Sequence, residues 1–175
     1  MKKEVEKLSK KDLEKLVLKA ASMNRQFRDY LLINFIDREL GESDLFEAAR
    51  ADLKVLCGKN YKGRSDEMRS ANMLVACNKR IGVFSKVCKD KSLEMDLIMD
   101  VLKSAFLPSR GFLGTCFTKF DYQVYLLVKK AITLLEDKLH EDYYIQYAAD
   151  INKYLKLLHD RSRHLNYVYA MPKTV

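Results

Sequence analysis

Residues 118–139 read TKFDYQVYLLVKKAITLLEDKL, and their apolar residues recur at the spacing of an amphipathic helix. The apolar stripe consists of Val124, Leu127, Val128, Ala131 and Leu135. Upstream, Thr118 and Asp121 have the spacing of a capping box, in which a hydroxyl and a carboxylate satisfy free backbone N–H groups. The sequence therefore predicts a helix that begins at Thr118 and runs to Leu139.

The same helical period continues on both sides of this stretch. Capping and helix-stopping residues mark the ends of six further expected helices. The first begins at Ser9, and the other five run from Asn24 to Gly41, from Ser43 to Gly58, from Ser65 to Lys89, from Ser92 to Leu107 and from Asp142 to Arg163. Gly82 destabilises the helix after Ser65 by about 1 kcal/mol relative to alanine, so the sequence allows either a continuous helix or a break at Gly82. No segment alternates at the period of a β-strand over a useful length. We expect an all-α fold of about seven helices in antiparallel hairpins, packed as an irregular bundle or as a short curved stack like that of helical repeats.

The composition is typical of one intracellular globular domain. The 175 residues include six glycines and two prolines, and 48% of them are hydrophobic. We expect a single domain over 1–175, with loosely ordered ends at 1–8 and 166–175. The charged start of the chain lacks the apolar core of a secretion signal. Stretches without Lys, Arg, Asp or Glu, of which Ser70–Asn78 is one of the two longest, are far short of the roughly 20 residues that cross a membrane. These features predict a cytoplasmic protein without a membrane anchor.

The cysteines and histidines do not form a recognisable site. Cys57, Cys77, Cys88 and Cys116 include no CxxC pair, so we expect reduced thiols and no disulfide. The three histidines are His140, His159 and His164. His159 and His164 are five residues apart, which turns them by about 140° on a helix and prevents them from sharing an ion. The loop at Ser109–Thr115 lacks the spacing of a phosphate-binding P-loop. We predict no catalytic residue, no metal and no cofactor.

Positive charge is concentrated between residues 59 and 91. This segment holds nine Lys and Arg against three Asp and Glu, within a chain of formal net charge +8. Five residues of the glycine-containing loop and the helix that follows it are the expected site for an anion or a nucleic acid, namely Lys59, Lys62, Gly63, Arg64 and Arg69. The competing interpretation is that these cations only solvate a helical surface. Tyr61 and Phe84 are the only aromatic residues that could stack on bases there.

Three classes of function follow from these patterns. The favoured hypothesis is a non-enzymatic helical binding or scaffold module that engages a protein partner, because no acid, base or nucleophile constellation is visible. The alternative is a nucleic-acid-associated protein that uses the basic segment 59–91. The third is an enzyme whose site is assembled from distant residues, which requires a deep pocket holding His140 or His159 beside carboxylates.

Four short motifs, in this order, carry a resemblance. They are Leu8–Leu13 (LSKKDL), Phe27–Leu31 (FRDYL), Ala51–Lys54 (ADLK) and Lys62–Arg64 (KGR). Together they resemble an uncharacterised bacterial all-helical protein family, a domain of unknown function, over most of the chain. The resemblance implies an all-helical fold. It implies no reaction, cofactor or site residue.

Overall fold

The computed structural model describes residues 2–36, 38–107 and 112–175, and all regular structure within these ranges is helical. The longer helices are α2 (Lys10–Met23), α3 (Arg25–Leu31), α4 (Arg38–Gly58), α5 (Asp66–Val87), α6 (Lys91–Ala105), α7 (Lys119–Asp137) and α8 (Asp142–Ser162), and the short ones are α1 (Lys2–Val5), the π-helix η1 (Leu32–Ile36) and α9 (Asn166–Tyr169). The predicted all-α fold is confirmed.

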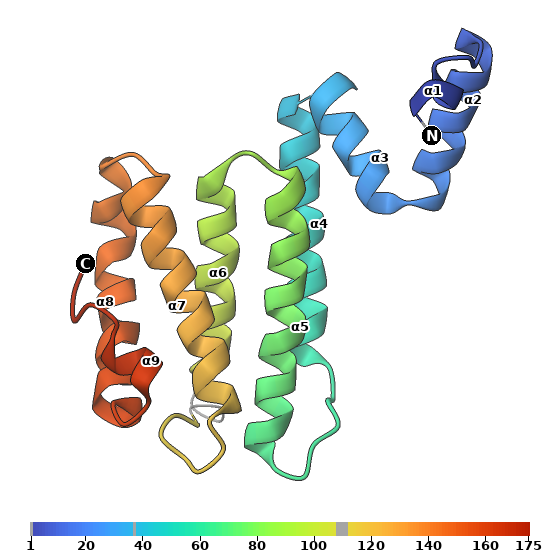
Figure 1. Cartoon of the computed structure of the whole chain (residues 1–175). Coiled ribbons are helices and arrows are strands. Elements are labelled where there is room, and N and C mark those ends of the chain that lie inside the picture. Colours follow the sequence, from blue (N-terminus) through green and yellow to red (C-terminus); the bar gives the residue numbers. More distant parts are fainter. Residues whose placement is uncertain (1, 37, 108–111) are drawn as a thin grey trace.

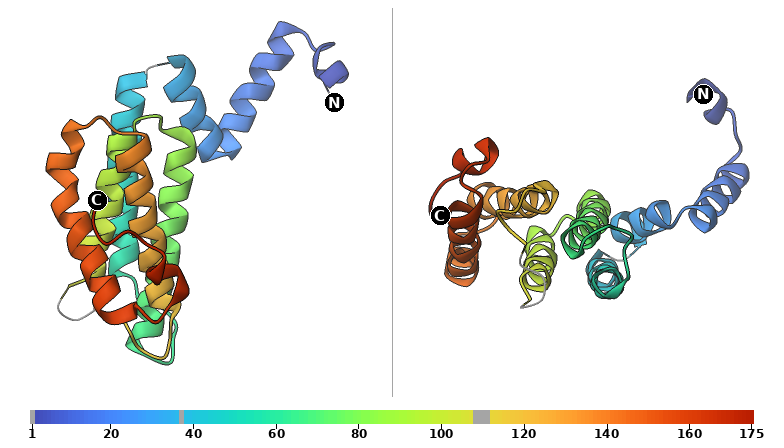
Figure 2. Two further views of the ribbon diagram at one scale, coloured as in Figure 1. Left: turned by 60° about the vertical axis from the view of Figure 1, so that its left-hand side comes forward. Right: turned by 90° about the horizontal axis from the view of Figure 1, so that it is seen from below.

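Helices α4 to α8 form a two-layered bundle, which we call the body (residues 38–175). In the view from below, α4 and α6 lie in one row and α5 and α7 in the other (Figure 2). Helix α5 packs against α4, α6 and α7, while α7 also packs against α8, and α8 against α9. Contacts between α4 and α6 and between α5 and α7 join one hairpin to the next. The body therefore combines features of both predicted arrangements, a bundle and a stack of hairpins.

The core of the body is apolar and closely packed. Its largest fully buried side chains include Phe84, Phe120, Leu127 and Ile151, which come from α5, α7 and α8. Phe106 joins the layers, because its ring stacks on Tyr154 with centroids 5.3 Å apart and meets Phe120 edge-on at 6.4 Å. Each large side chain buried in this way contributes roughly 1.5–3 kcal/mol. The body is thus a stable platform for the surfaces around it.

Several predicted helix ends are confirmed. The Ser9 hydroxyl accepts a hydrogen bond from the Asp12 backbone N–H at the start of α2, and Ser65 does the same for Met68 at the start of α5. Helix α4 ends at Gly58 and α6 at Ala105, before Leu107, as expected. Helix α5 continues through Gly82 without a break.

The predicted helix end at Gly41 and the predicted start at Ser43 are wrong. Helix α4 begins at Arg38 and runs through both positions. Gly41 is instead needed for close packing, because a Cβ atom there would lie 2.8 Å from Leu32 Cδ2 and 3.0 Å from Ile33 Cγ1. The glycine allows η1 to lie directly on α4.

The capping box predicted at Thr118 is also wrong. Thr118 makes no side-chain capping hydrogen bond, and α7 ends at Asp137 rather than Leu139. The Asp121 carboxylate is fully buried and accepts hydrogen bonds from the Gly114 backbone N–H at 2.9 Å and from the Ser162 hydroxyl. This carboxylate therefore joins the turn before α7 to the end of α8 instead of capping its own helix.

The two ends of the chain differ in their packing. In residues 2–36, which we call the arm, α1 and α2 stand apart from the body (Figure 1), and α2 has no buried residue, whereas η1 at the base of the arm packs on α4 and buries Ile33. Residues 166–175, which the sequence suggests are loosely ordered, hold α9 and the fully buried Val168. Their backbone follows α8, since Asn152 Nδ2 donates to the Val175 carbonyl at 3.3 Å.

Candidate functional site

The loop between α4 and α5 is held against the first turns of α5. Asn72 Nδ2 donates to the Lys62 carbonyl at 2.8 Å, and Arg69 Nη1 donates to the Gly63 carbonyl at 3.0 Å. A Cβ atom at Gly63 would lie 3.0 Å from the Arg69 backbone nitrogen, so the loop approaches the helix more closely than other residues allow. These contacts give the predicted binding loop a defined shape.

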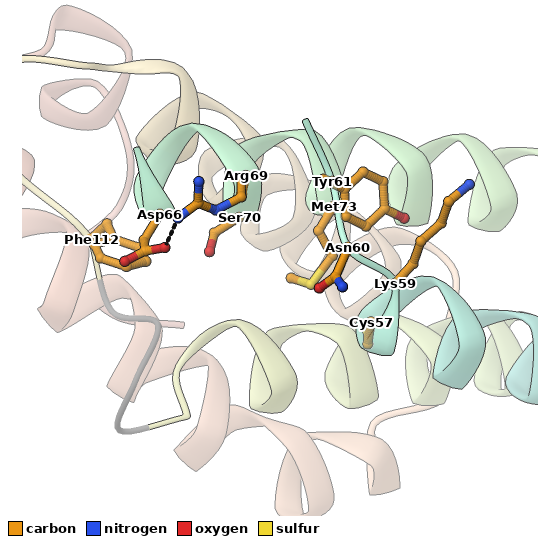
Figure 3. A pocket seen from close by; sticks show the side chains of 9 residues that line it. All are labelled: Cys57, Lys59, Asn60, Tyr61, Asp66, Arg69, Ser70, Met73 and Phe112. Carbon is orange, nitrogen blue, oxygen red and sulfur yellow. Dashed lines mark hydrogen bonds and ion pairs between the residues drawn. The ribbon is translucent and has the colours of Figure 1, made fainter. Parts of the chain in front are cut away.

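A cavity of about 180 Å³ lies between this loop and α5 (Figure 3). It is lined by Cys57, Lys59, Asn60, Tyr61, Asp66, Arg69, Ser70, Met73 and Phe112. Asp66 and Arg69 lie at one end, and the Lys59 ammonium group points away from them at the other (Figure 3). The cavity therefore brings together two of the five predicted site residues, Lys59 and Arg69.

The other predicted residues have different positions. Lys62 and Arg64 are exposed and do not line the cavity, and Gly63 contributes the carbonyl that Arg69 binds. The Arg69 guanidinium also forms an ion pair with Asp66. Lys59 lies 6.0 Å from the centre of the Tyr61 ring, where a cation–π interaction holds it.

The start of α5 already carries its own negative charge. Asp66 and Glu67 occupy its first turn, where carboxylates interact favourably with the helix dipole. Glu67 is buried and accepts a hydrogen bond from the Thr115 hydroxyl. An incoming anion would compete with these two carboxylates, so the geometry gives the predicted anion site little support.

The remaining charge of the basic segment is spread along α5 and partly neutralised. Arg80 binds Asp52 at 2.8 Å and Lys91 binds Glu94 at 2.9 Å. Lys86 and Lys89 lie near the end of α5, about 30 Å from the loop at its start. Segment 59–91 therefore presents two separate groups of cations rather than one patch.

A buried hydroxyl and two thiols lie beside the cavity. The Tyr61 hydroxyl is buried and has no hydrogen-bond partner in the described part of the chain. Burial, together with the nearby Cys77 and Cys57, raises the pKa of Tyr61. Cys57 Sγ and Cys77 Sγ are 3.9 Å apart. Sequence spacing gave no signal for this pair, because α4 and α5 bring together residues 20 positions apart.

A second cavity, of about 600 Å³, is an open basic groove on the outer face of α8, beside residues 173–174. Its basic side chains are Lys153, Lys156, His159, Arg163 and Lys173. Asp160 also lines it and binds Lys156 at 2.6 Å. The spacing of three to four residues between the α8 members was visible in the sequence, but the fold was needed to show that this face is exposed.

The histidines do not converge. His159 Nε2 lies 3.1 Å from the Pro172 carbonyl, His140 Nδ1 lies 3.1 Å from Asp142 Oδ2, and His164 is exposed. Within residues 2–36, 38–107 and 112–175, no group of three or more His, Cys, Asp or Glu could hold a metal ion. The same ranges contain no helix that is both long and apolar enough to cross a membrane.

The arm carries the largest group of exposed apolar side chains. They are Val5, Leu8, Leu16, Val17, Leu18, Met23, Tyr30, Phe35 and Ile36. Leu13, Leu16, Val17 and Ala20 recur at the helical spacing and form one apolar face of α2. In the structure Leu16 is 50% exposed and Val17 39% exposed, so the face is largely uncovered.

Comparisons with protein-family models, with curated proteins and with solved structures found no match to this chain. The resemblance to an all-helical bacterial family therefore stays a prediction. The function has to be argued from the surfaces described above.

Proposed function

We propose that this chain is a non-enzymatic helical binding module whose arm docks on a protein partner. The observation that carries the proposal is the uncovered apolar face of α2, which has no buried residue along its 14 positions. Contiguous exposed apolar surface of this kind marks interaction sites on soluble proteins.

The arm has the form of a docking element. Helix α2 contacts α3, to which it is joined by a bend, and it stands apart from the body (Figures 1 and 2). A helix of 14 residues is only marginally stable in water without a packed face. A partner that covers Leu16 and Val17 would remove apolar area from water and would stabilise the helix at the same time.

The charge of the arm favours an acidic partner. Residues 2–31 contain nine Lys and Arg against five Asp and Glu. We therefore propose a partner protein whose apolar docking surface is flanked by acidic side chains, since complementary charge steers association and fixes orientation.

Two leucines on α2 provide a matched test. Leu16 belongs to the apolar face, whereas Leu18, which is 71% exposed, lies about 200° away on the helix. Wild-type protein, Leu16→Glu and Leu18→Glu would each be immobilised and exposed to cell extract, and the proteins that each one captures would be quantified. A captured protein would then be purified and titrated against the three variants at several salt concentrations. We expect Leu16→Glu to weaken the purified partner's binding by at least about tenfold, with Leu18→Glu close to wild type.

Light scattering measures the oligomeric state of the unliganded chain and so tests whether a second copy of the chain covers the arm instead. A wild-type dimer that becomes monomeric in Leu16→Glu would mean that a second copy covers the arm, and the acidic partner would be excluded. If the chain is monomeric and both variants bind every captured protein as tightly as wild type does, the proposal is contradicted.

A second candidate, nucleic-acid binding, is favoured by the groove on α8 rather than by the loop. The groove has four Lys and Arg side chains against one carboxylate, on a face open to solvent. Titration with generic RNA and duplex DNA across a salt series tests it, with Lys153→Glu plus Arg163→Glu compared with Lys62→Ala plus Arg64→Ala. Binding that falls with salt and is lost only in the first pair would support the groove, and loss only in the second would return the site to the loop.

A further inference from the structure

We propose that Cys57 and Cys77 are a redox pair, which a low-molecular-weight disulfide such as glutathione disulfide converts to an intramolecular disulfide. The inference does not depend on the proposed function. It rests on the 3.9 Å separation of the two sulfurs and on the different exposure of the two thiols.

The separation requires only a small movement. A disulfide bond is about 2.05 Å long, so the sulfurs must approach by roughly 2 Å. Cys57 is in the last turn of α4 and is partly exposed, whereas Cys77 lies inside α5 and is fully buried. Rotation of the partly exposed Cys57 side chain towards α5 is the movement that we expect to bring the two sulfurs together.

Solvent access determines which of the two thiols reacts first. Cys57 lines both the 180 Å³ cavity and a further cavity of about 240 Å³, whose other lining residues come from α4 and α6. Cys77 lines neither cavity and is fully buried. Cys57 is therefore the attacking thiol, and Cys77, which solvent does not reach, is the resolving thiol.

The reaction balances with one molecule of glutathione disulfide. The Cys57 thiolate attacks one glutathione sulfur and expels the other glutathione as a thiolate, which takes up the proton that Cys57 lost. Cys77 then gives up its proton and attacks the Cys57 sulfur, which breaks the mixed disulfide and releases the second glutathione. Two protein thiols are oxidised to one disulfide, and one glutathione disulfide is reduced to two thiols.

The remaining cysteines are internal comparators. Cys88 is buried, and burial raises its pKa to about 11, which leaves almost no thiolate at neutral pH. Cys116 is exposed, so it reports what exposure alone allows. If the reaction is specific to the pair, Cys57 and Cys77 must be oxidised faster than both Cys88 and Cys116.

The test follows the full chain through glutathione redox buffers. Samples would be quenched with an alkylating reagent and analysed by intact-mass and peptide mass spectrometry. We expect wild-type protein to lose about 2 Da and two alkylation sites, both assigned to Cys57 and Cys77, with no glutathione retained at either. Cys116→Ser should behave as wild type at this pair.

Single variants separate the two roles. Cys77→Ala should accumulate the mixed disulfide at Cys57, because no resolving thiol is present, and Cys57→Ala should leave Cys77 reduced at the same times. Circular dichroism before oxidation checks that each variant is folded, and Cys57→Ser provides a second variant at the partly exposed position.

Two results would overturn the proposal. One is wild-type protein in which Cys57 and Cys77 remain reduced, or Cys57 retains glutathione, across the whole redox series. The other is a Cys77 that reacts as fast in Cys57→Ala as in wild type, since access to the buried sulfur would then not pass through Cys57.

Discussion

Helices α2 and α6 have nearly the same length, 14 and 15 residues, and opposite environments. Helix α6 buries eight residues between its neighbours, whereas α2 buries none. Both have an apolar face at the helical period. The comparison shows that an amphipathic pattern determines which side of a helix is apolar, while only the neighbouring elements determine whether that side is covered.

The largest expected difference between the two regions is the cost of removing a leucine. Leu97→Ala in α6 should lower the free energy of unfolding by about 2–5 kcal/mol, because Leu97 is fully buried and its removal leaves a cavity. Leu16→Ala in α2 should change it by less than about 0.5 kcal/mol. Urea unfolding of both variants measures the difference, and equal costs would mean that the arm folds onto the body in solution.

Gly114 should be the next most sensitive position of the body. Its φ is +77°, and a Cβ atom would lie 2.4 Å from the Arg161 carbonyl oxygen. Gly114→Ala should therefore cost about 2–4 kcal/mol from backbone strain and the clash together. Gly82→Ala is the control, since a Cβ atom there meets nothing within 4 Å, and should stabilise α5 by about 0.4–1 kcal/mol. Thermal unfolding should therefore shift in opposite directions for the two variants.

The body contains a buried, ion-paired carboxylate, Glu94. The described residues of the arm include no equivalent. Glu94 is buried, and its carboxylate lies 2.9 Å from Lys91 Nζ and 2.5 Å from Lys130 Nζ. Burial opposes its ionisation, but the hydrogen bonds from Lys130, Lys91 and Ser85 outweigh burial and lower the pKa of Glu94 below its ordinary value of 4.5. We expect Glu94→Gln to cost about 1–3 kcal/mol at pH 7.

The pH dependence of this cost is a further check. A lowered pKa in the folded protein gives stability that is present above pH 4.5 and is lost as the pH falls through the folded value. The difference in unfolding free energy between wild type and Glu94→Gln should therefore shrink on acidification. A difference that stays constant between pH 7 and acidic pH would show that the charge of Glu94 is not responsible.

The smallest effect is expected at the cap of α2. Ser9→Ala removes the hydroxyl that accepts from the Asp12 backbone N–H, which should cost α2 about 1 kcal/mol. Since α2 is not part of the cooperative core, the change should appear as faster amide hydrogen exchange in Lys10–Met23, with unchanged global unfolding. A shift of global unfolding would show that α2 and the body unfold together.

Helix positions could be predicted from the sequence because caps, stops and apolar periods are local. The helix starts at Ser9 and Ser65 and the end at Gly58 are examples. Gly41 was misread because its lack of a side chain serves contact with Leu32 and Ile33 rather than a helix end. Asp121 was misread in the same way, since its partners Gly114 and Ser162 were assigned to other segments.

The candidate sites depended on the fold to a much greater degree. The predicted loop residues Lys59 and Arg69 do line a cavity, but Asp66 and Glu67 already supply negative charge beside it. The approach of Cys57 to Cys77 and the exposed basic face of α8 result from packing between helices, which no spacing within one helix records.

The sequence by itself determined the secondary structure class, the approximate helix boundaries and the apolar face of each long helix, because backbone hydrogen bonding and side-chain period act within a few residues. Only the tertiary structure decided which of those faces are covered. It left Leu16 and Val17 in solvent, buried Asp121 between two elements and placed Cys77 beside Cys57. Burial is a property of the whole packed chain, so neither the exposed arm nor the thiol pair could be read from any one segment.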